Sequence, residues 1–112
     1  MRVVWAKPAT DDIVRIKEYL TDRSPTNAKK VLRLVTDAVK VLGDQPYIGR
    51  PGHVADTREL VISGLPYVVV YGVIETKSPP EIAIYHVYHG AQNWQVHMET
   101  EFTATPGENS LR

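Results

Sequence analysis

The stretch TRELVISGLPYVVVYGVIETKSPPEIAIYHVYHGAQNW, residues 57–94, decides the fold. It contains three runs rich in Val, Ile and Tyr, which are separated by Gly64-Leu65-Pro66 and by Ser78-Pro79-Pro80. Runs of this composition between Gly and Pro residues are typical of β-strands joined by turns. The stretch therefore predicts an antiparallel meander with strands over residues 59–63, 67–74 and 82–89.

The second and third of these runs are apolar on both faces. Side chains alternate between the faces of a strand, so Tyr71 and Val70 should lie on opposite faces of the second run, and His86 and His89 on opposite faces of the third. Neither run has a polar side that would face water. Both strands are therefore expected in the centre of the sheet, covered on both faces.

The residues before the meander predict one more strand and two helices. Residues 2–6 form a short β-prone run, and apolar residues at helical spacing then predict helices over residues 8–21 and from Ser24 to Gly43. Residues 44–56 contain two Pro and two Gly without a period, which predicts a returning loop. The order is β-α-α-β-β-β, an α+β fold in which a helical hairpin packs on a four-stranded, mainly antiparallel sheet.

The composition excludes several classes of protein. A length of 112 residues fits one domain, and the 13 basic and 13 acidic residues cancel, so the net charge recruits neither nucleic acid nor an anionic membrane. The absence of cysteine excludes disulfides and thiol catalysis, and it fits a reducing cytosol. No run resembles a signal peptide or a membrane span, so a soluble cytoplasmic protein without membrane contact is expected.

The apolar pattern fades after Trp94. Residues 95–112 are mostly polar and contain Pro106-Gly107. We expect one domain over residues 1–94 and a polar, flexible C-terminal tail over residues 95–112.

Several short segments, in their order along the chain, resemble the RelE/ParE family of bacterial toxins. The resemblance covers about residues 2–94 and rests on Gly49-Arg50-Pro51, Thr57-Arg58-Glu59-Leu60, Tyr67-x-Val-x-Tyr71 and Val87-Tyr88-His89-Gly90-Ala91-Gln92-x-Trp94. It implies the toxin of a type II toxin–antitoxin module, which arrests bacterial growth and is neutralised by a cognate antitoxin. It also implies that operator DNA is contacted only through the antitoxin.

The resemblance leaves two activities open, because one fold can host several functions. RelE-like members cut mRNA on the ribosome, whereas ParE-like members inhibit DNA gyrase. Cleavage of RNA without a metal needs a proton-transfer group, a cation for the charged phosphorane and an aromatic ring for a base. The candidates for these roles are His89, Arg58 and Tyr71. Each of these residues also has a structural alternative. His89 would form a hydrogen bond that fixes a turn, Arg58 would form a salt bridge, and Tyr71 would lie in the core.

Three further residues are candidates for target binding. Arg50 and His53 lie in the Pro/Gly loop, where functional residues often gather, although a solvated loop is the alternative. Trp94 either stacks on a target or docks on the core. The histidines show no metal-ligand spacing, and the chain has no phosphate-binding glycine motif, so neither a metal nor a cofactor is predicted.

The distribution of cations favours gyrase over the ribosome. An RNA-cutting sheet must neutralise phosphates, but five of the six lysines fall on the predicted helices or just before them, and only Lys77 lies in the meander. Family members often carry Arg or Lys where this chain has Gln92-Asn93. We therefore interpret the chain as a ParE-like inhibitor of DNA gyrase. The alternatives are a ribosome-dependent mRNA endoribonuclease and a non-toxic, antitoxin-binding module.

Overall fold

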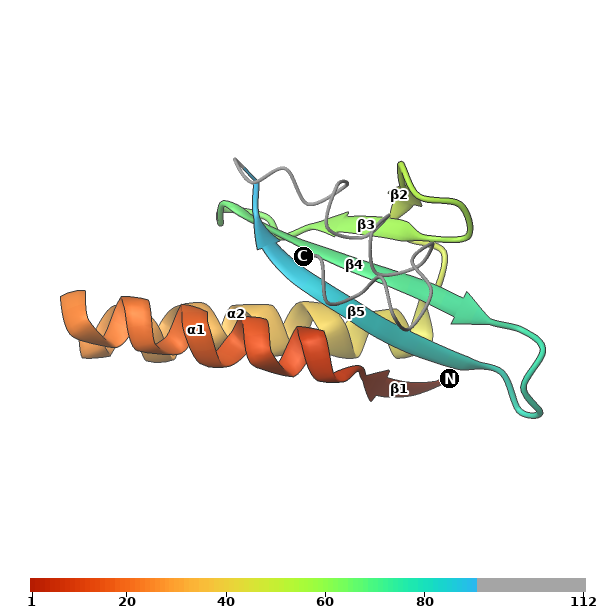
Figure 1. The fold of residues 1–112 in the computed structure, drawn as a ribbon, viewed down its shortest axis with the longest axis horizontal. Helices are drawn as coiled ribbons and strands as arrows, with labels where there is room; N and C mark the ends of the chain where they lie inside the picture. Colours follow the sequence, from red (N-terminus) through yellow and green to blue (C-terminus); the bar gives the residue numbers. More distant parts are fainter. Residues whose placement is uncertain (91–112) are drawn as a thin grey trace, which may run out of the picture.

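The protein consists of two antiparallel helices packed on one face of a twisted five-stranded sheet (Figure 1). The computed structural model describes residues 1–90. Its elements, in chain order, are β1 (Arg2–Trp5), α1 (Lys7–Arg23), α2 (Pro25–Asp44), β2 (Arg50–Pro51), β3 (Arg58–Val61), β4 (Tyr67–Ile74) and β5 (Glu81–His89).

The strands lie in the order β1-β5-β4-β3-β2. Strand β1 pairs in parallel with β5, and every other pair is antiparallel. The predicted α+β class, the helical hairpin and the central positions of β4 and β5 are confirmed. The predicted strand count of four was wrong, because Arg50 and Pro51 of the expected loop pair with Glu59 and Arg58 as a fifth strand.

A single serine separates the two helices. The Ser24 backbone N–H donates to the Leu20 carbonyl (2.8 Å), which ends α1, and its hydroxyl accepts from the Asn27 N–H (3.3 Å), which begins α2. Pro25 follows at the first position of α2, where a missing N–H costs nothing. Helix α1 begins one residue before the predicted range and ends two residues after it, since no breaker precedes Ser24.

The main core lies between the helices and the sheet. Buried residues of α1 and α2 meet the helix-facing residues of β4 and β5 and the residue that follows β3. The members are Ala9, Val31, Val35, Val39, Leu42, Ile62, Tyr67, Val69, Tyr71, Ile82, Ile84 and Val87.

A β-bulge in β5 changes which residues face the helices. Val70 pairs with His86, but Tyr71 pairs with Ile84, so the β4–β5 register skips Tyr85. Ile84 and Val87 therefore share the helix-facing core, although strict alternation along β5 would place them on opposite faces. The prediction of uninterrupted alternation was wrong for this strand.

The outer face of the sheet carries a second, smaller cluster. Val70 and Tyr88 are buried there, with Val54 and Tyr85 packed against them. The Tyr85 ring lies so close to Gly72 that a Cβ at this glycine would meet it at 2.9 Å. The helices thus cover one face, and this cluster with Val54 from the β2–β3 connection covers part of the other.

Candidate functional site

A groove of about 580 Å³ runs between α1 and the neighbouring ends of β4 and β5. It is the place where one of the candidate catalytic residues, His89, reaches the surface. The rings of His89 and Tyr67 pack in a T-shaped arrangement, with 5.7 Å between their centroids and 83° between their planes. The lining residues are Asp12, Arg15, Ile16, Tyr19, Leu20, Pro66, Tyr67, Val87, Tyr88 and His89.

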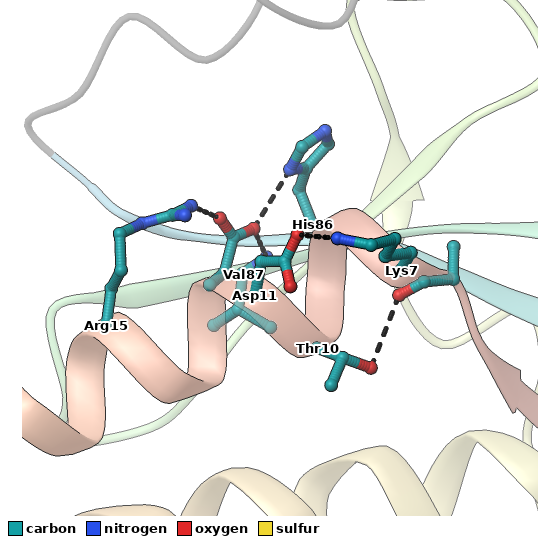
Figure 2. A network of polar contacts seen from close by, with 8 residues as sticks. Lys7, Thr10, Asp11, Arg15, His86 and Val87 are labelled. Carbon is teal, nitrogen blue, oxygen red and sulfur yellow. Dashed lines mark hydrogen bonds and ion pairs between the residues drawn. The ribbon is translucent and has the colours of Figure 1, made fainter.

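The buried carboxylate of Asp12 lines this groove and joins α1 to β5. One carboxylate oxygen accepts from the Val87 backbone N–H (2.9 Å) and lies 2.9 Å from His86 Nδ1, while the other is paired with the Arg15 guanidinium. Figure 2 shows Arg15, His86 and Val87 converging on this carboxylate of α1. A side chain that is only 4% exposed thus joins α1 to β5 directly after the bulge.

Tyr67 and Tyr85 differ electrostatically from ordinary surface tyrosines. Burial raises the pKa of Tyr67, with a smaller contribution from Tyr19. Burial likewise raises the pKa of Tyr85, with a smaller contribution from Asp56. Ionisation of both hydroxyls is thus moved further above neutral pH, where a tyrosine is protonated in any case.

Tyr71 is part of the core. Its side chain is fully buried, its hydroxyl donates to the Pro46 carbonyl (2.8 Å), and the same oxygen accepts from the Gly49 N–H (2.9 Å). Both hydrogen-bonding capacities are used to hold the segment that follows α2. In this structure the ring is not available for stacking on a base.

Arg58 is directed at the same segment. Its Nε donates to the Gly49 carbonyl (3.0 Å), and one terminal nitrogen donates to the carbonyls of Gly49 (2.7 Å) and Tyr47 (3.1 Å). The guanidinium also lies 5.5 Å from the centroid of the Tyr47 ring. Side-chain hydrogen bonding to Glu75 is the main reason why the pKa of Tyr47 is raised, and Arg58 opposes that shift.

Arg50 and His53 are brought together by a buried glutamate. Glu59 is only 2% exposed, and one of its oxygens accepts from Arg50 through Nε (2.9 Å) and a terminal nitrogen (2.8 Å). Its other oxygen lies 3.2 Å from His53 Nδ1. The cluster ties the short strand β2 to β3, while the side chains of Arg50 and His53 remain mostly exposed.

The predicted catalytic residues do not converge on one point. Arg58 and Tyr71 lie opposite each other on β3 and β4, but His89 lies opposite Tyr67, four residues further along β4. At the rise of an antiparallel strand this separation is about 13 Å. Trp94 lies outside the described residues, as does the predicted tail.

No metal or membrane element is formed by residues 1–90. Within that range no three His, Asp or Glu side chains come close enough to hold a metal ion. None of the helices there is both long and apolar enough to cross a bilayer.

Two buried carboxylates that organise these regions, Asp12 and Glu59, were not singled out from the sequence. Asp12 follows Ala9 by three residues and precedes Ile16 by four, so helical spacing already puts it on the apolar face of α1. That position was a usable signal. Glu59 had no comparable signal, because its partners come from a loop of unpredictable path.

Replacing Glu59 with glutamine is expected to lower the free energy of unfolding by about 1–2 kcal/mol, because Arg50 and His53 lose a charged acceptor. The cost stays moderate, since both partners can turn to water. Urea denaturation followed by circular dichroism measures it. Glu18→Gln on the exposed face of α1 is the matched control, and equal effects of the two changes would contradict the structural role of Glu59.

Comparison with known proteins agrees with this architecture. A family model described as the ParE toxin of type II toxin-antitoxin system, parDE, matches residues 3–94. The protein named "Putative toxin Y4kP" from Sinorhizobium fredii (strain NBRC 101917 / NGR234) is 31% identical over 93 residues, which is 83% of this chain and 92% of the relative.

Two solved structures share the fold. A chain of the chromosomal ParDE TA system from P. aeruginosa has a TM-score of 0.69 and 25% identity, over 80% of this chain and 95% of that one. The YoeB/ParE toxin from Agrobacterium tumefaciens has a TM-score of 0.54 and 17% identity, over 80% of this chain and 98% of that one, which supports the fold alone. The family model covers nearly all of the residues that the structure describes. This chain therefore belongs to the ParE toxin family of type II toxin–antitoxin systems.

Proposed function

We propose that this protein arrests bacterial growth by binding and inhibiting DNA gyrase, and that a cognate antitoxin neutralises it. It would act through a protein surface, without a reaction of its own and without a metal or cofactor. Any contact with operator DNA would be made by the antitoxin.

The placement of the three candidate catalytic residues carries this proposal. Tyr71 uses its hydroxyl within the core, and Arg58 uses its guanidinium on two backbone carbonyls. His89 is about 13 Å away along β4. RNA cleavage would need these groups around one nucleotide, whereas inhibition by binding makes no such demand.

An antitoxin partner is supported by family membership and by exposed apolar surface. The similar solved structure from P. aeruginosa is described as a ParDE TA system, which is a toxin–antitoxin pair. In this chain several large apolar side chains on the two helices are exposed, which suits a partner's helix or strand. They are Val14, Tyr19, Leu34 and Val41.

The test is to express the protein without an antitoxin and to follow DNA and protein synthesis separately by uptake of labelled precursors. The proposal predicts that DNA synthesis falls first, and that the purified protein inhibits supercoiling by gyrase. An early fall in protein synthesis with codon-phased mRNA cuts would instead identify a ribosome-dependent endoribonuclease. A chain that arrests neither process would be a non-toxic, antitoxin-binding module.

A His89→Ala variant is expected to inhibit supercoiling within about threefold of the wild type, because the proposed mechanism has no proton-transfer step. The side chain is exposed, so the free energy of unfolding should change by only about 0.5 kcal/mol. The measurement is the concentration that gives half-maximal inhibition, with Glu18→Ala on the exposed face of α1 as a control. If a folded His89→Ala protein no longer arrests growth, His89 has a catalytic role and the proposed mechanism is wrong.

A further inference from the structure

Three cationic side chains gather near the start of α2. Lys29, Lys30 and Arg33 are exposed, and together with Pro25 and Thr26 they line one hollow of the surface. Residues three and four apart share a helix face, so Arg33 lies between the two lysines on that face. Within the described part of the chain, none of the three takes part in an ion pair. We call these three residues the α2 basic cluster.

The α2 basic cluster differs from most other cations of the protein. Lys7, Arg15, Arg50 and Lys77 are each paired with a carboxylate. Arg58 is bound to backbone carbonyls, and the guanidinium of Arg23 lies 3.5 Å above the centre of the Tyr19 ring. The chain has no net charge, so this local excess is not part of a generally basic surface. It gives this region a local excess of positive charge.

The position of the α2 basic cluster suits contact with another molecule. Helices α1 and α2 meet at Ser24, and Figure 1 shows that this closed end of the hairpin projects past the strands of the sheet. The cluster can therefore approach a second surface without interference from the sheet.

We propose that the α2 basic cluster contacts the phosphate backbone of the duplex DNA that gyrase holds, which rests on the proposed function. Duplex DNA carries about one negative charge per 1.7 Å of its axis, so it presents a high density of negative charge in that complex. Lys29 and Arg33 are about 6 Å apart along the helix axis, a span of about two phosphates of one strand. About three phosphate contacts cannot hold a net-neutral chain on DNA alone, so they add to a protein interface.

The first measurement compares toxin binding to gyrase with and without a bound duplex. Biotinylated duplex loaded with gyrase, and gyrase immobilised without DNA, are each exposed to the full-length wild-type protein. We expect tighter binding when DNA is present. The DNA-dependent part should weaken by about 40-fold between about 50 and about 200 mM salt, the change expected for three phosphate contacts.

The matched comparison uses two triple variants with equal loss of charge. Lys29→Gln/Lys30→Gln/Arg33→Gln removes the cluster, whereas Arg2→Gln/Lys17→Gln/Lys40→Gln removes three exposed cations elsewhere. The first variant should lose the DNA-dependent gain and the steep salt dependence, and the second should keep both. Circular dichroism checks that each variant is folded.

The possible failures are distinguishable. If the cluster variant binds the gyrase–DNA complex as tightly as the wild type, the DNA contact is wrong while gyrase inhibition stands. If the cluster variant loses as much affinity for gyrase without DNA as for the gyrase–DNA complex, the cluster recognises an acidic protein surface. The proposed DNA contact is then again wrong. If the wild type binds neither form of gyrase, the proposed function itself fails.

Discussion

Replacing Asp12 with alanine is expected to lower the free energy of unfolding by about 3–5 kcal/mol. The carboxylate is buried, accepts the Val87 N–H, and contacts His86 Nδ1 and the Arg15 guanidinium. Removing it leaves a backbone donor and a buried imidazole without their acceptor, which costs much more than the loss of an exposed pair. The measurement is urea denaturation at neutral pH followed by circular dichroism.

Asp11→Ala is the control for this change, because the two aspartates are neighbours on the same helix. Asp11 pairs only with the exposed Lys7, so its removal should cost no more than about 0.5 kcal/mol. Asp12→Asn should fall between the two, since an amide oxygen can still accept from the Val87 N–H. Equal costs for the two alanine variants would show that the buried carboxylate does not hold α1 to β5.

The features of the fold that depend on local periodicity could be predicted from the sequence. The spacing of apolar residues identified both helices, and the dense Val, Ile and Tyr runs identified β4 and β5 as central strands. The serine and proline at positions 24 and 25 located the helix boundary, because their side chains act within one turn. These signals need no knowledge of the rest of the chain.

The features that depend on distant contacts could not be predicted in this way. Strand β2 has only two residues, and its pairing is supported by the contact between Arg50 and Glu59. No glycine in the sequence marks the bulge at Tyr85, although the bulge decides that Val87 joins the core against the helices. A shift of one residue turns every later side chain to the other face.

The same distinction applies to the candidate site. The sequence placed Arg50 and His53 in one loop, and the structure joins both side chains to Glu59. The sequence could not show that the Tyr71 hydroxyl would form hydrogen bonds with the segment after α2. That outcome depends on the path of residues 45–49, which bring two backbone groups to one buried oxygen.

Gly49→Ala is expected to lower the free energy of unfolding by about 3 kcal/mol or more. A Cβ at this position would lie 2.7 Å from the Glu59 carbonyl oxygen, 2.7 Å from the Tyr71 hydroxyl and 2.8 Å from a Tyr71 ring carbon. The first contact is with the backbone of a central sheet position, and the Tyr71 ring is fully buried, so neither can move aside cheaply. Movement of residue 49 would also weaken its hydrogen bonds with Tyr71 and Arg58.

Two further variants test this explanation by urea denaturation. Gly90→Ala is the matched control, because its Cβ would meet only the Pro66 carbonyl at an ordinary 3.5 Å, and it should change the free energy of unfolding by no more than about 0.5 kcal/mol. Tyr71→Phe alone should cost about 1–3 kcal/mol, since it removes a buried hydrogen-bond partner. In the Gly49→Ala background the same change should cost less, because it also removes one of the close contacts. Additive effects, or a Gly49→Ala cost no greater than that of Gly90→Ala, would mean that the segment after α2 is not held against Tyr71 as tightly as these distances require.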